Sequence, residues 1–232
     1  MKQYGNHAAV DDLSFTVETG KVVGFLGPNG AGKSTTMNMI TGYIAPTSGI
    51  VLIDGVDMEE EPELVRKNIG YLPENPPLYP DMRVREYLYF VAELKKVPRK
   101  DRDVMVNEIM NRTKIVDVSE RLIRHLSKGY KQRVGLAQAI LGFPEIIILD
   151  EPTAGQDFRH YTDIMEFLRG LNAQGVTVVM ITHDMHLMLE YTPRALAFCD
   201  GRLIADRSAA AILCDPALIE QAALKETSLY TL

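Results

Sequence analysis

The eight residues Gly27–Ser34 have the spacing of a phosphate-binding loop, G-x-x-x-x-G-K-S/T. Glycines let the backbone curl so that its N–H groups point at phosphate oxygens, and the N-terminus of a following helix adds a favourable dipole. Lys33 can reach the β- and γ-phosphates of a nucleotide, and the Ser34 hydroxyl can ligate Mg²⁺. The candidate binding residues are therefore Gly27, Pro28, Asn29, Gly30, Ala31, Gly32, Lys33, Ser34 and Thr35.

Two carboxylates follow a fully apolar run, because Ile146–Leu149 leads directly into Asp150 and Glu151. At the carboxyl end of a strand, Asp150 can hold Mg²⁺ directly or through water, and Glu151 can polarise an attacking water. The pattern alone also fits a strand that ends in an acidic turn. The phosphate loop elsewhere in the chain favours the metal-binding interpretation.

A second candidate phosphate-facing helix begins near Ser127. The segment Leu126–Arg133 places a good N-cap residue type, Ser127, before a helical run, and Gly129 lets another backbone approach closely. This signal is weak by itself, and its position upstream of Asp150 strengthens it.

The elements that must position these residues alternate between strands and helices. Short apolar runs predict strands at 22–26, 50–53, 146–149 and 176–181, and Asp200-Gly201 predicts a hairpin between 195–199 and 202–205. Helical spacing covers 32–41 and most of 83–141, with breaks at Pro98 and at 126–129. The alternation predicts an α/β fold with a parallel sheet, and residues 72–140 are expected to form a helical insertion.

Composition limits the possible classes of protein. The chain has 232 residues, a net charge of −6 and 46% apolar residues, which suits a globular α/β domain rather than a nucleic-acid binder. Two cysteines, Cys199 and Cys214, exclude a disulfide scaffold and favour a reducing compartment. No apolar stretch approaches 18 residues and Met1–Val10 lacks a signal core, so we expect membrane contact only through a partner or a surface patch.

Taken together, these motifs resemble the ATP-binding subunits of ABC transporters. In that resemblance Gly27–Ser34 is the Walker A motif, Ile146–Asp150 is Walker B and Leu126–Tyr130 is the signature. Glu151 matches the catalytic glutamate, His183 the switch histidine, Asp157 belongs to the D-loop, and Tyr4 matches the aromatic residue that stacks on adenine. The resemblance implies a P-loop NTPase of the ABC type. Its RecA-like core and antiparallel β-subdomain would span 1–71 and 141–232, with the helical subdomain at 72–140.

The resemblance also implies an ATP hydrolase that drives a permease. Two such domains, identical or different, would pair head to tail on the cytoplasmic face of a bacterial membrane. Each would sandwich Mg-ATP between its own Walker A motif and the partner's signature, so that Leu126, Ser127, Lys128, Gly129 and Tyr130 act in trans. His183 and Lys33 would contact the γ-phosphate in cis, and the implied Mg²⁺ ligands are Ser34, Glu74 and Asp150.

Several positions depart from the family pattern. Lys128 and Tyr130 replace a glycine and a glutamine of the signature, and Glu74 stands where the family has a glutamine. The chain up to about Thr153 resembles exporter-type ATPases, whereas from about Ala154 it resembles energy-coupling-factor ATPases. Only Met1–Gln3 precede Tyr4, where the family has a strand of several residues. We therefore expect a truncated β-subdomain and weaker adenine binding.

Other functions remain open at this stage. A catalytically impaired regulator would bind ATP without hydrolysis, and a nucleic-acid-handling ATPase of the same type would need the basic surface that this acidic chain lacks. We expect residues 72–140 to carry the groove for a permease. Candidate docking residues there, which core packing explains about as well, are Leu78, Tyr79, Met82, Tyr87 and Tyr89.

Overall fold

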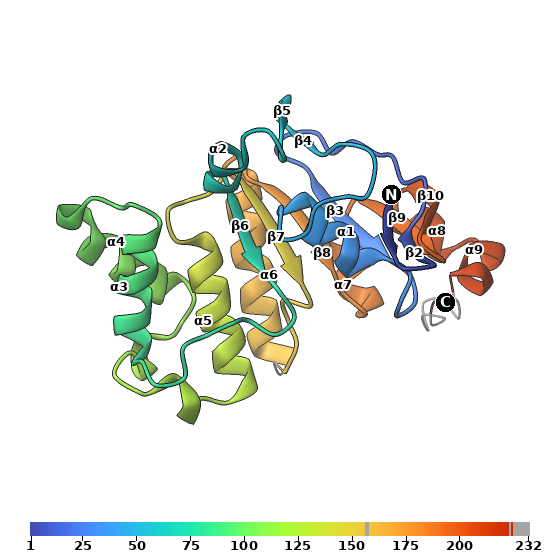
Figure 1. Cartoon of the computed structure of the whole chain (residues 1–232). Helices are drawn as coiled ribbons and strands as arrows, with labels where there is room; N and C mark the ends of the chain where they lie inside the picture. The colour runs from blue at the N-terminus through green and yellow to red at the C-terminus, as the bar shows by residue number, and fades with distance from the viewer. Residues whose placement is uncertain (156–157, 223, 225–232) are drawn as a thin grey trace. The chain divides into compact units, whose positions relative to one another are not determined.

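The computed structural model describes residues 1–155, 158–222 and 224 (Figure 1). The chain divides into two compact units. The first comprises Met1–Arg66 and Thr177–Leu232, and the second comprises Lys67–Val176.

The first unit is organised around strand β3 (Val22–Leu26). Strands β8 (Thr177–Ile181) and β9 (Arg194–Cys199) flank it in parallel, and β10 (Arg202–Arg207) pairs antiparallel with β9. The register places Phe25 opposite Ile181 on one side and Leu196 on the other. All three of these side chains are buried, which explains why the parallel strands are predominantly apolar.

Helices of the first unit include α1 (Lys33–Ile40), α7 (Met185–Tyr191), α8 (Ala209–Leu213) and α9 (Pro216–Gln221). Helix α7 begins where the Asp184 carboxylate accepts hydrogen bonds from the backbone N–H groups of His186 and Leu187. A Cβ atom added to Gly24 would lie 2.1 Å from Met188 Sδ, so a larger residue at this position of β3 would displace the Met188 side chain of α7.

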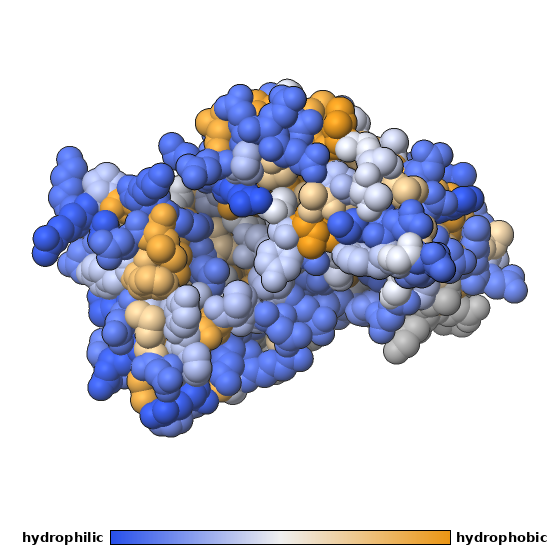
Figure 2. Space-filling model, in the orientation of Figure 1, coloured by the Kyte–Doolittle hydropathy of each residue, from blue (hydrophilic) through white to orange (hydrophobic). Residues whose placement is uncertain are grey.

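Two small antiparallel pairs and a short helix complete this unit. Strand β1 (Lys2–Tyr4) pairs with β2 (His7–Val10), and β4 (Leu52–Ile53) pairs with β5 (Val56–Asp57) ahead of α2 (Pro62–Lys67). Figure 2 shows apolar side chains gathered over β4, β5 and α2 at the top of the view. The exposed apolar side chains of this region are Tyr43, Ile50, Leu52 and Leu64.

In the second unit, β6 (Ile69–Leu72) and β7 (Ile146–Asp150) pair in parallel, with Leu72 opposite Leu149. The helices are α3 (Val84–Leu94), α4 (Arg99–Arg112), α5 (Lys128–Ile140) and α6 (Phe158–Ala173), with 3₁₀ turns at Val116–Val118 and Ile123–His125. Helix α4 begins directly after Pro98, and α5 begins after Ser127. Both breaks expected in the helical run are therefore confirmed.

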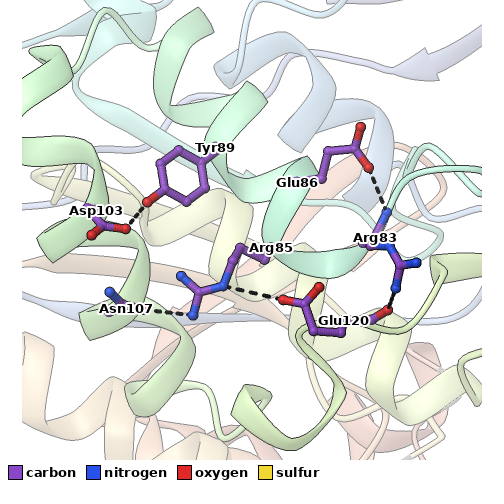
Figure 3. A network of polar contacts seen from close by, with 7 residues as sticks. All are labelled: Arg83, Arg85, Glu86, Tyr89, Asp103, Asn107 and Glu120. Carbon is purple, nitrogen blue, oxygen red and sulfur yellow. Dashed lines mark hydrogen bonds and ion pairs between the residues drawn. The ribbon is translucent and has the colours of Figure 1, made fainter.

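Polar contacts connect α3 to α4 and to the loop that follows them (Figure 3). Arg85 Nη2 donates to Asn107 Oδ1 at 2.9 Å, and Arg85 Nε lies 3.6 Å from Glu120 Oε1. The Tyr89 hydroxyl donates to Asp103 across the same pair of helices. Tyr87 is only 2% exposed, and its hydroxyl donates to Gln138. This side chain is therefore part of the core, and the expectation that it could be an exposed docking residue is wrong.

Among the described residues, the structure contains no helix that is both long and apolar enough to cross a membrane.

Candidate functional site

At several positions, the loop between β3 and α1 has a backbone conformation that only glycine adopts easily. The φ angles of Gly27, Gly30 and Gly32 are +139°, +83° and +95°. A Cβ atom on Gly32 would lie 2.6 Å from the carbonyl oxygen of Ala9, so this turn also needs the small residue for space. The loop thus has the curled form in which backbone N–H groups gather around an anion.

Lys33 is buried, and its ammonium group lies over this loop. Nζ donates to the carbonyl oxygens of Gly27 and Pro28 at 2.7 and 2.8 Å, and the residue is 6% exposed. The positive charge therefore sits at the N-terminus of α1, where the helix dipole also favours an anion. Asn29, Gly30 and Ser34 are exposed, which leaves the mouth of the loop accessible to a ligand.

His183 belongs to the same edge of the sheet as this loop. It follows β8, which runs parallel to β3 with Ile181 opposite Phe25, so both strands end on the same side. His183 is exposed, and Asp184 beside it caps α7. The first unit therefore brings the predicted switch histidine and the phosphate loop to one edge.

Tyr4 ends β1 and is 52% exposed. Its register partner in β2 is His7, and the ammonium group of Lys2 lies 5.4 Å from the centroid of its ring. A three-residue strand thus leads into Tyr4, and the backbone N–H of Gln3 donates to Thr47 Oγ1 at 3.0 Å, anchoring this strand. An exposed ring on an anchored strand is the arrangement that stacking on a base needs.

In the second unit, the carboxylates follow the C-terminal ends of neighbouring strands. Asp150 ends β7 and is 6% exposed, and Glu151 follows it with a left-handed backbone, φ +51°. Glu74 lies in the loop after β6, the parallel neighbour of β7, and is exposed. All three oxygen-bearing side chains thus stand at one edge of this strand pair.

The signature segment begins α5 in the manner predicted. Ser127 is the N-cap, and its side-chain oxygen accepts a hydrogen bond from the backbone N–H of Tyr130 at 3.3 Å. The Tyr130 hydroxyl donates to Asp117 Oδ2 at 2.6 Å, and this hydrogen bond raises the pKa of Tyr130. The centroid of the Tyr130 ring lies 5.0 Å from Arg133 Cζ. Asp157 lies outside the described residues.

One polar residue of this region was not anticipated from the sequence. Gln132 on α5 is 1% exposed, and its Nε2 donates to the carbonyl oxygen of Glu151 at 3.0 Å. Its only signal in the sequence is a polar residue inside a helical run, which does not disclose a contact 19 positions away.

The fold and the glycine-rich loop define a nucleotide-binding domain of the phosphate-loop type. The sequence pattern of the ABC transporter family matches residues 10–154. A protein of Enterococcus faecalis named for the ATP-binding part of an ABC transporter is 45% identical over 99% of this chain and 41% of its own length. A similarly named protein of Clostridium perfringens is 40% identical over 96% of this chain and 40% of its own length.

Solved structures agree with these sequence relationships. The dimer of the ATP-binding cassette MJ0796 bound to ADP and phosphate superposes with a TM-score of 0.83 at 27% identity, over 89% of this chain and 94% of that chain. The structure of cbiO1 from Clostridium perfringens, part of the ABC transporter complex cbiONQ, gives a TM-score of 0.78 at 28% identity, over 94% of this chain and 88% of that chain.

The chain therefore belongs to the ABC transporter family and is an ATP-binding domain of that family. It spans about two fifths of the length of the curated relatives that it matches. The Enterococcus protein aligns with 99% of the chain, so the residues before and after Thr153 are aligned together with one relative.

Proposed function

We propose that this chain binds and hydrolyses Mg-ATP, and that pairs of such domains drive a membrane permease. The observation that carries the proposal is the Lys33-centred loop, in which a buried ammonium group, glycine-dependent backbone turns and a helix N-terminus converge. These are the groups that bind and neutralise the phosphates of a nucleotide.

In the proposed reaction, Lys33 and the loop N–H groups hold the phosphates and stabilise the charge that develops on the γ-phosphate. Glu151 orients and polarises the attacking water, and His183 contacts the same phosphate. The oxygen donors Ser34, Asp150 and Glu74 suit Mg²⁺, which prefers such ligands. When bound, this ion neutralises charge on the phosphate oxygens.

Dimerisation and a permease are part of the same proposal. Two domains would close around two nucleotides, with Ser127 and Gly129 of each contacting the other's nucleotide. ATP binding would close the pair and hydrolysis would reopen it, a two-state cycle that a membrane partner can use. The partner would sit on the cytoplasmic face of a bacterial membrane, and no nucleic acid is expected.

An apolar surface of the first unit supports the proposal that the chain binds a protein partner. Tyr43, Ile50 and Leu52 are 79%, 68% and 52% exposed, close in sequence to the residues that line a hollow of about 250 Å³. Met39, Ile44, Val51 and Met58 are among the residues that line the hollow. Exposed apolar patches on globular domains mark interaction sites.

Phosphate release by the purified chain tests the hydrolytic step. We expect Mg-dependent release in the unaltered chain, a loss of at least about 100-fold in Glu151→Gln with ATP binding retained, and loss of ATP binding in Lys33→Ala. The unaltered chain would instead be a regulator if it bound ATP tightly and released no phosphate. The same result would have to hold after an equimolar amount of a different ATP-binding domain is added as a dimer partner.

A further inference from the structure

The backbone of Glu151 is held in an unusual conformation. Its φ of +51° lies in the left-handed region, which is strained for a residue that carries a Cβ atom. The Ala154 N–H donates to the Glu151 carbonyl oxygen at 3.0 Å, closing a tight turn directly after β7. The direction of the Glu151 carboxylate therefore depends on whatever keeps this turn in place.

Helix α5 supplies a second hydrogen bond to the same carbonyl oxygen. Gln132 Nε2 donates to it at 3.0 Å from a side chain that is 1% exposed. A buried amide that loses its acceptor is left desolvated without a partner, which is unfavourable. The Gln132 hydrogen bond therefore favours the conformation in which the Glu151 carbonyl oxygen faces α5.

The far end of the turn also contacts α5. A Cβ atom placed on Gly155 would lie 3.0–3.2 Å from Cβ, Cγ and Cδ of Lys128, so the methylene groups of this lysine line the Gly155 backbone. Gly155 itself has φ +74°. The first turns of α5 therefore hold the loop at both of its ends.

We propose that Gln132 is a positioning residue for Glu151. Its amide fixes the left-handed backbone of Glu151 and, through it, the direction of the carboxylate that polarises the attacking water. The inference rests on the proposed function of Glu151. It adds a link between the helix that carries the signature and the carboxylate that serves hydrolysis within the same unit.

The test compares Gln132→Met with Gln138→Met. Methionine keeps the length of glutamine but has no N–H donor, and Gln138 lies on the same helix with its amide oxygen bonded to the Tyr87 hydroxyl. In Gln132→Met we expect kcat to fall roughly 10-fold with KM within about twofold, since misplaced groups lower the rate more than binding. Hydrogen exchange at the Ala154 amide should accelerate roughly 10-fold. Both values should stay within about twofold of wild type in Gln138→Met.

A second variant, Gln132→Glu, gives a pH-dependent readout. The protonated carboxyl group can donate to the Glu151 carbonyl oxygen, whereas the ionised form repels it, and burial raises the pKa of such a group. The ratio of kcat in Gln132→Glu to kcat in wild type should therefore rise as the pH falls. A ratio independent of pH would contradict the role assigned to the amide donor.

Two failures can be told apart. Ala154 exchange that is unchanged in Gln132→Met would overturn the positioning role, whether or not the chain hydrolyses ATP. Equal losses of kcat in Gln132→Met and Gln138→Met would also overturn it, because they would indicate a general loss of packing. Absence of phosphate release from the unaltered chain would instead overturn the proposed function on which the inference rests.

Discussion

Replacing Gly32 with alanine should destabilise the chain more than replacing Gly30, although the two glycines share one loop. Their φ angles are +95° and +83°, so alanine meets a left-handed backbone at both positions, at a cost of roughly 1–2 kcal/mol. The surroundings differ. A Cβ atom on Gly32 would lie 2.6 Å from Ala9 O and 3.3 Å from Val10 Cγ2, whereas a Cβ atom on Gly30 would have no neighbour within 4 Å.

The obstacle at Gly32 is a backbone carbonyl of strand β2, so relief requires the strand or α1 to move. Forcing an extra methyl group into such a packed position typically costs a further 1–3 kcal/mol, on the order of an overpacked core site. We therefore expect Gly30→Ala to lower the free energy of unfolding by about 1–2 kcal/mol and Gly32→Ala by about 2–5 kcal/mol.

Urea unfolding, followed by circular dichroism for both variants and the wild type, measures this difference. The m-values should stay equal, so that midpoints can be compared directly. Equal destabilisation of the two variants would refute the steric argument and leave only backbone strain. A Gly32→Ala variant as stable as wild type would also refute the conformation described for the loop.

Three further perturbations test other parts of the account. Tyr4→Ala should weaken ATP binding roughly 5-fold, about 1 kcal/mol of stacking, as measured by titration calorimetry, and unchanged affinity would exclude Tyr4 as the adenine platform. Ser34→Ala should lower ATP affinity in the presence of Mg²⁺ and leave it unaltered in EDTA, since the hydroxyl is proposed as a metal ligand. Hydrogen bonds from Arg194 lower the pKa of Asp206. The stabilisation by this pair should therefore be complete above the unfolded pKa of about 3.9 and be lost as the pH falls through the lowered folded value. Urea midpoints of Asp206→Asn and wild type should accordingly converge at acid pH, and a constant gap between them would contradict this assignment.

The fold was predictable where burial leaves a strong local pattern. Strands β3 and β7 are mostly buried and rich in large apolar residues, and the expected helix after the phosphate loop is α1. The Asp200-Gly201 turn was recognisable because an Asp-Gly pair is a common sequence signal for a two-residue hairpin. Both residues adopt the positive φ angles that such a turn needs, +48° and +78°. Strand β6 gave a weaker signal, because Gly70 and the half-buried Tyr71 interrupt its apolar run.

The candidate site was predictable to the extent that its parts are local in sequence. The spacing of Gly27–Ser34 specifies the loop by itself, and the residues that follow strand ends could be placed at a sheet edge from the alternation alone. The left-handed conformation of Glu151 and its hydrogen bond from Gln132 depend on the position of α5 relative to the turn after β7. No local sequence pattern indicates that position. The hydrogen bond from the Tyr130 hydroxyl to Asp117 likewise depends on the fold and not on a local pattern.

The mass of the Glu151→Gln variant in solution, measured by light scattering with and without Mg-ATP, tests the central claim most directly. Since this variant should bind ATP and hydrolyse it very slowly, we predict a shift from monomer to dimer that requires both Mg²⁺ and ATP. A Lys33→Ala, Glu151→Gln double variant should remain monomeric as the matched control. A Glu151→Gln chain that binds Mg-ATP yet stays monomeric, alone and with an equimolar second cassette, would contradict a composite ATP site shared by two such domains.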